Sequence, residues 1–262
     1  MIKKLRGWTN MISDLKKAAL SSIRGHWGLG VGVTLLYYGI PAIGMFMIGG
    51  SIFMLFSLII GMIDPDSFVE YSVTGEAIVD SSAVFFLGLA TVIMWAIIFI
   101  IYIATQSIMG YGYNNFTLRL AKKESTTISD LFEGFKKNNL FRSVKLGILQ
   151  TILILLWSLL LIVPGIIKFF SYSMAYYILI ENPEYTASEA IKKSKEMMQG
   201  HKLDLFITWL SFIGWFILGS LVGIFTLNIP YLWINPYYTT TISHFYLNLS
   251  KRENNMEELR VN

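Results

Sequence analysis

The chain has no cysteine among its 262 residues, which excludes disulfides, thiolate metal sites and a thiol nucleophile. Charge is scarce too, because charged residues make up 15% of the chain and a soluble domain typically carries about 25%. Catalytic signatures are also missing: there are no paired carboxylates within an apolar run, zinc-type His/Glu spacing, nucleophile elbow or phosphate loop. We therefore expect no enzymatic activity, no catalytic or metal-binding residues and no cofactor.

Long uncharged runs dominate what is present. The chain is 54% apolar, its mean hydropathy is +0.56, and its uncharged runs are 25–63, 81–118, 146–167 and 205–250. A helix crosses a bilayer with about 20 predominantly apolar residues, and charges within it are costly. The sequence predicts an all-α polytopic membrane protein, with residues 1–262 forming a single membrane domain.

The basic residues are clustered, and this clustering predicts the orientation. Of the 21 Lys and Arg residues, all but Lys168 lie in segments 3–24, 119–145, 192–202 and 251–260. Segment 64–80 has five acidic residues and no basic one. Because basic residues stay on the cytoplasmic side during insertion, the four clusters go inside and 64–80 goes outside. The basic excess is thus a topology signal, and we expect no nucleic-acid partner.

Six spans in three hairpins, with both termini cytoplasmic, satisfy this charge distribution. We expect run 25–63 to be one long, kinked span, although two short spans remain an alternative. Residues 82–118 then return, 143–163 and the following stretch to Ile180 turn at Pro164-Gly165, and 205–250 makes two spans turning at residues 228–230. Proline at 164 suits the first turn of a helix, where its missing N–H has no partner anyway.

Three amphipathic helices are expected at the cytoplasmic face, at 11–24, 128–138 and 186–198. The first has Lys16 and Lys17 off its apolar stripe, so we expect it in the inner headgroup layer with its lysines towards anionic lipid. The third begins with a capping box formed by Thr186 and Glu189. Glu181-Asn182-Pro183 is expected to end the preceding span.

An internal repeat is indicated by the starts of these helices. Ile12-Ser13-Asp14-Leu15 recurs as Ile128-Ser129-Asp130-Leu131, and Ser13 to Gly25-His26 has the same spacing as Ser188 to Gly200-His201. Three copies of helix, span, turn and span would occupy 9–118, 127–182 and 186–250. Such units keep one orientation, so the repeats would be parallel about an axis along the membrane normal. Chance similarity among short capped helices is the alternative.

A family resemblance covers the last two thirds of the chain. Its most recognisable residues are Trp157-Ser158-Leu159-Leu160, Pro164-Gly165-Ile166-Ile167-Lys168, Glu181-Asn182-Pro183, Leu210-Ser211-Phe212-Ile213-Gly214-Trp215 and Pro236-Tyr237. This part resembles an uncharacterised family of integral membrane proteins of Firmicute-type bacteria, catalogued as a domain of unknown function. More remotely it is similar to the membrane domain of glycerophosphodiester phosphodiesterases, although no hydrolase domain is present. The resemblance implies a bacterial cell membrane location and brings no activity or site residues.

Four polar residues are candidate lipid or substrate contacts: Lys168, Asn235, Thr240 and His244. Lys168 is the one basic residue expected on the outer side, where it could contact an outer-leaflet phosphate or simply extend to the headgroups. Asn235, Thr240 and His244 are expected inside the sixth span. An ionisable group there is a functional candidate, whereas interhelical hydrogen bonding is the simpler role.

These features favour a non-enzymatic integral membrane protein that acts through membrane lipids or other membrane proteins. Its role would be in envelope homeostasis, export or self-protection. The alternative is a small transporter or lipid flippase with a site on the central axis, which the repeats and the polar row of the sixth span favour. An enzymatic function would need ionisable residues from several spans to meet in a cleft at one membrane face.

Overall fold

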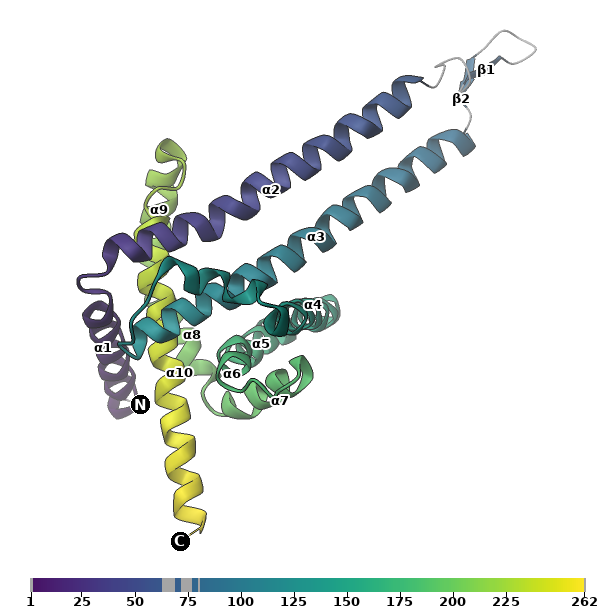
Figure 1. Cartoon of the computed structure of the whole chain (residues 1–262). Helices are drawn as coiled ribbons and strands as arrows, with labels where there is room; N and C mark the ends of the chain where they lie inside the picture. Colours follow the sequence, from purple (N-terminus) through teal and green to yellow (C-terminus); the bar gives the residue numbers. More distant parts are fainter. Residues whose placement is uncertain (1, 63–68, 72–76, 80, 262) are drawn as a thin grey trace. The chain divides into compact units, whose positions relative to one another are not determined.

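A computed structural model of the chain describes residues 2–62, 69–71, 77–79 and 81–261, and it is mainly helical (Figure 1). A single antiparallel pair of short strands occurs within these residues, with Val69 opposite Val79. The predicted acidic loop at 64–80 otherwise lies outside the described residues. The elements are α1 (Ile2–Ile23), α2 (Trp27–Met62), β1 (Val69–Tyr71), β2 (Ala77–Val79), α3 (Ser81–Ala121), η2 (Ile128–Phe135), α4 (Lys137–Leu160), α5 (Ile162–Tyr172), α6 (Ala175–Glu181), α7 (Ala187–Met197), α8 (Lys202–Leu210), α9 (Ile213–Thr226) and α10 (Tyr231–Val261).

Four of the described helical segments are long and apolar enough to cross a membrane: Trp27–Ile59, Phe85–Ala121, Lys137–Leu160 and Ile162–Glu181. The pair α8 and α9, bent by 41°, makes a fifth if it forms one broken span. Helix α10 is not among them. It combines a polar stretch with a charged end, and it continues to Val261, well past the predicted limit at residue 250.

The chain forms two compact units, Met1–Tyr38 with Gln106–Asn262, and Gly39–Thr105. In the second unit, large apolar side chains are turned outward: Phe46 is 80% exposed and Phe85 is 66% exposed. Residues 45–53 of α2 and 94–98 of α3 line an entirely apolar hollow of about 340 Å³. Residues 27–62 form one helix that includes Pro41, so the two-helix alternative is wrong for this stretch.

Helices α4 and α5 pack side by side and are joined at Leu161, whose backbone is extended. The predicted break at Pro164-Gly165 is therefore displaced by three residues. Pro164 lies in the first turn of α5, as its missing N–H favours. Gly165 is needed where the two helices meet, because a Cβ there would lie 2.2 Å from Ser158 Oγ and 2.9 Å from Ser158 Cα.

Helix α6 ends at Glu181, which confirms the predicted stop at Glu181-Asn182-Pro183. The capping box of α7 is also confirmed. The Thr186 backbone N–H donates to Glu189 Oε2 over 2.7 Å, and the Glu189 N–H donates back to Thr186 Oγ1 over 3.3 Å. Both signals act within four residues, so no distant part of the chain is required to produce them.

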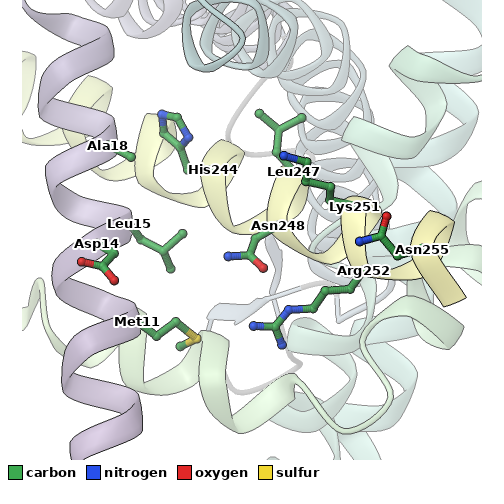
Figure 2. A pocket seen from close by; sticks show the side chains of 10 residues that line it. All are labelled: Met11, Asp14, Leu15, Ala18, His244, Leu247, Asn248, Lys251, Arg252 and Asn255. Carbon is green, nitrogen blue, oxygen red and sulfur yellow. The ribbon is translucent and has the colours of Figure 1, made fainter.

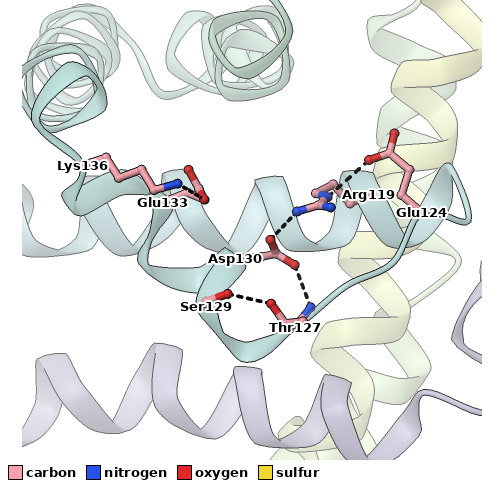
Figure 3. Close-up of polar contacts among 7 residues, drawn as sticks. All are labelled: Arg119, Glu124, Thr127, Ser129, Asp130, Glu133 and Lys136. Atoms are coloured by element: carbon pink, nitrogen blue, oxygen red, sulfur yellow. Dashed lines mark hydrogen bonds and ion pairs between the residues drawn. The ribbon is translucent and has the colours of Figure 1, made fainter.

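The predicted amphipathic helix at 128–138 is wrong: residues 128–135 form the 3₁₀ helix η2, and α4 begins at Lys137. Close backbone packing on α3 explains the difference. A Cβ on Gly112 of α3 would lie 1.7 Å from the Leu131 carbonyl oxygen, and one on Gly134 would lie 2.2 Å from the Ile108 carbonyl oxygen. Asp130 then pairs with Arg119 and accepts from the Thr127 N–H over 2.7 Å (Figure 3).

The apolar stripe of α1 packs against other helices of the protein, α10 among them. Leu15, Ala19 and Ile23 are at most 5% exposed, and α1 contacts α10. The Nζ of Lys16 donates to the Ser211 carbonyl at the end of α8 over 2.8 Å, a protein contact that the predicted orientation towards lipid did not include. A cation at a helix C-terminus is favourable, and partial burial lowers the pKa of Lys16.

The helix junctions at Gly25-His26 and Gly200-His201 have the same local geometry. Both glycines have φ +86°, which side chains rarely adopt. The N–H groups of His26 and His201 donate to the carbonyls three residues back, and their own carbonyls accept from Gly30 and Leu205, four residues on. The proposed units nevertheless begin with different elements, since Ser13 lies within α1 whereas Ser129 and Ser188 lie at the starts of η2 and α7.

Candidate functional site

Three of the four predicted contact residues lie along α10, and the fourth, Lys168, lies on α5. The Nζ of Lys168 is 4.3 Å from the centroid of the Trp157 ring, on the neighbouring helix α4. A cation over an aromatic face is stabilised by about 0.5–1 kcal/mol at an exposed site. This contact fixes the Lys168 side chain at the α4–α5 junction, and the predicted phosphate contact remains untested.

The polar row of α10 contributes to a network of hydroxyl groups inside the first unit. Thr239 Oγ1 donates to the Tyr113 hydroxyl over 3.4 Å. One turn later, Ser243 Oγ lies 3.1 Å from Thr117 Oγ1 and 3.4 Å from the Tyr177 hydroxyl. All of these groups are uncharged, and they join α10 to α3 and α6. They therefore match the simpler prediction of interhelical hydrogen bonding.

Thr240 and Asn235 differ in their surroundings. Thr240 is fully buried, and its hydroxyl has no hydrogen-bond partner among the described residues. A buried hydroxyl without a partner costs roughly 1–3 kcal/mol. Asn235 is half-buried, and its carbonyl accepts from Thr239 over 2.7 Å. The structure thus places the predicted residues on one helix without bringing them together at one site.

His244 faces α1, where its Nε2 lies 3.0 Å from Ser22 Oγ. It also lines a pocket of about 590 Å³ between α1 and α10 (Figure 2), here called the α1–α10 pocket. Four lining residues are apolar and six are polar or charged: Met11, Leu15, Ala18 and Leu247, and Asp14, His244, Asn248, Lys251, Arg252 and Asn255. We regard this pocket as the candidate functional site.

Helical spacing explains how α10 builds one wall of this pocket. His244, Asn248 and Asn255 fall on one face at intervals of four and seven residues, with Lys251 and Arg252 between them. Figure 2 shows these side chains opposite Asp14 and Leu15 of α1. Lys251 and Arg252 are exposed, and within the described residues neither has a carboxylate within 4.0 Å.

A second hollow, of about 500 Å³, lies among α6, α7 and α10. Its charged residues are paired: Lys122 with Glu181, and Lys193 with Glu253 over 2.5 Å. The Tyr246 hydroxyl also donates to Glu181, over 2.5 Å. Ionisable residues from several helices therefore meet here, as an enzymatic function requires, but each of these four charges has an opposite charge as its partner.

Other hydrogen bonds in the first unit join residues that are far apart in the sequence. Trp8 Nε1 donates to Asp204 over 2.9 Å, and Arg142 Nη2 donates to the carbonyls of Asn182 and Tyr185 over 2.8 and 2.9 Å. No local motif indicates such pairs. Asp14 and Arg252 were also missed as pocket residues. The one available signal was the shared helical face of residues 244, 248, 252 and 255.

Comparison with known proteins matches part of the chain to a protein family. No curated protein and no solved structure matches the chain. A family model described as "Protein of unknown function (DUF975)" matches residues 160–253, from the end of α4 into α10. The match includes the α10 wall of the α1–α10 pocket as far as Glu253, but not the α1 wall. Over residues 160–253 the chain is therefore similar to this family, whose function is unknown.

Proposed function

We propose that this chain is a non-enzymatic integral membrane protein that acts through contacts with lipids or other membrane proteins. In this proposal six helices cross a bacterial cell membrane, with α10 as the sixth, and both termini are cytoplasmic. Envelope homeostasis, assistance to export and self-protection against membrane-active peptides are the roles that suit it. We also propose that the protein comes from a Firmicute-type bacterium and that it is remotely similar to the membrane domain of glycerophosphodiester phosphodiesterases.

The observation that carries the proposal is the outward position of large apolar side chains. Leu159, Phe225 and Leu227 are 84%, 89% and 91% exposed, around the turns of α4–α5 and α9–α10. Contiguous exposed apolar surface marks a place for lipid or for another protein. The charged residues of the α6–α7–α10 hollow instead pair with one another, Lys122 with Glu181 and Lys193 with Glu253.

Reconstitution of the purified full-length protein into liposomes tests this function. We expect no flux of small solutes or fluorescent lipids above that of empty liposomes, together with a measurable preference for particular lipids. Flux at turnover-like rates would contradict the proposal.

A small transporter or flippase is the second candidate, favoured by the position of His244 in the α1–α10 pocket. On this alternative, His244→Ala and Lys168→Ala abolish flux in the same liposomes. Flux that is unchanged in both variants would contradict the transporter mechanism. The enzymatic alternative has weaker support, because the charges named in the α6–α7–α10 hollow are already paired.

A further inference from the structure

The α1–α10 pocket is lined by both apolar and positively charged side chains. Met11 and Leu15 of α1, with Leu247 of α10, provide an apolar lining. Lys251 and Arg252 supply two positive charges, against the single carboxylate of Asp14. The lining thus matches a ligand with an apolar body and a negatively charged head.

The dimensions of the pocket also suit such a ligand. At a rise of about 1.5 Å per residue, the α10 wall from His244 to Asn255 is about 16 Å long. The apolar residue Leu247 lies nearer the His244 end, whereas Lys251 and Arg252 lie nearer the charged end of the helix. The charged end is also where α10 leaves the predicted membrane, at the level of the inner headgroups.

We propose that the α1–α10 pocket binds an anionic phospholipid, with Lys251 and Arg252 contacting the phosphate and an acyl chain lying along Ala18 and Leu247, at the His244 end of the pocket. The inference rests on the proposed lipid-contact function and names the lipid class. Basic residues near the membrane surface attract anionic headgroups, and an arginine binds phosphate through paired donors. The amides of Asn248 and Asn255 can donate to the remaining headgroup oxygens.

Lipid affinities measured by native mass spectrometry on the full-length protein test the contacts. Phosphatidylglycerol should bind more tightly than phosphatidylcholine, and the double variant Lys251→Gln/Arg252→Gln should weaken its binding about tenfold. Both residues are exposed, so the variant should fold normally. Asp14→Asn should instead tighten binding a few-fold, because it removes the one negative charge of the lining.

Lys192→Gln/Lys195→Gln is the matched control, since it removes the same charge from exposed positions on α7. Phosphatidylglycerol binding should not change in this control. An equal loss in both double variants would show that surface charge alone attracts the lipid, and it would overturn the site. If only the site fails, the lipid-contact function still stands; turnover-like flux in liposomes would contradict that function separately.

The position of the lipid can be measured with a single cysteine, because the chain has none of its own. Ala18→Cys, on the pocket wall, should react more slowly with a maleimide when phosphatidylglycerol is added to protein in phosphatidylcholine nanodiscs. Ser21→Cys, exposed on the same helix outside the lining, should react at an unchanged rate. Equal protection by soluble glycerol phosphate would overturn the lipid as occupant, and no protection at residue 18 would overturn the site.

Discussion

Asp130 is a buried carboxylate at the point where η2 meets the end of α3. Its side chain is 4% exposed, and it pairs with Arg119 while accepting from the Thr127 N–H (Figure 3). Arg119 also pairs with Glu124 over 3.2 Å, but that contact is half-exposed and thus screened by water. The Asp130 contacts therefore hold the η2 segment at the end of α3.

The first prediction concerns this carboxylate. Asp130→Asn should lower the free energy of unfolding by about 2 kcal/mol, because it removes a charge-assisted pair at a buried site. Glu124→Gln is the control and should change it by less than about 0.5 kcal/mol. Thermal or denaturant unfolding of the detergent-solubilised variants measures both. Equal effects would show that Asp130 is not the dominant partner of Arg119.

At the scale of elements, two kinds of signal operate. Capping and stop signals act within a few residues, and they correctly predicted the start of α7 and the end of α6. Close packing between two helices depends on single glycines that leave room for the neighbouring helix. Gly165 of α5, which lies against Ser158 of α4, is an example. The first kind decides where a helix begins or ends, and the second decides how near its neighbour can come.

Substitution at Gly165 tests the helix contact. Gly165→Ala should destabilise the protein by about 1–3 kcal/mol, because its Cβ would overlap Ser158 and force α4 and α5 apart. Gly214→Ala, in α9, is the control: no heavy atom lies within 4 Å of its added Cβ. That variant should keep its stability or gain a few tenths of a kcal/mol. A stability loss as large at residue 214 would contradict steric overlap as the cause.

The capping box of α7 predicts a pH dependence. Hydrogen bonds from Thr186 hold the pKa of Glu189 below its ordinary value, so the folded state favours the carboxylate. Its stabilising contribution is present above an ordinary glutamate pKa of about 4.3 and is lost as the pH falls through the lower folded-state pKa. Unfolding measured between about pH 3 and 6 should show a weaker slope in Glu189→Gln than in the parent.

Glu196→Gln, exposed on the same helix, is the control for this slope and should leave it unchanged. A slope that is the same in the parent and in Glu189→Gln would mean that the capping carboxylate makes no contribution in the folded protein.

At the scale of the whole molecule, the topology rests on the distribution of charge. Four described helical segments are apolar enough to cross a membrane, or five with the bent α8–α9 pair. If the bent pair counts as the fifth crossing, both termini can lie inside only if α10 is a sixth. Its hydroxyl-rich face is compatible with this, because Thr239 and Ser243 are hydrogen-bonded to other helices rather than facing lipid.

Cysteine labelling tests that topology. Single cysteines at Ser72, Leu227 and Glu258 should report two of the three predicted outer turns and the inner C-terminal end. In intact cells a membrane-impermeant maleimide should label positions 72 and 227, whereas position 258 should react only after permeabilisation. Labelling of position 72 only from the inside would contradict the assignment of the acidic segment and the six-span count with it.

The sequence by itself predicted the apolar helices, the capping box at Thr186, the stop at Glu181 and the polar character of α10, because each depends on neighbours along the chain. Tertiary structure decided that residues 128–135 form a 3₁₀ helix, since Gly112 and Gly134 allow backbone contact with α3 there. Tertiary structure also placed Lys16 in hydrogen-bond contact with Ser211 and His244 in hydrogen-bond contact with Ser22. In each pair the two residues are more than 190 positions apart in the sequence. Such contacts depend on side-chain packing after the helices have met, which periodicity and charge along the sequence do not encode.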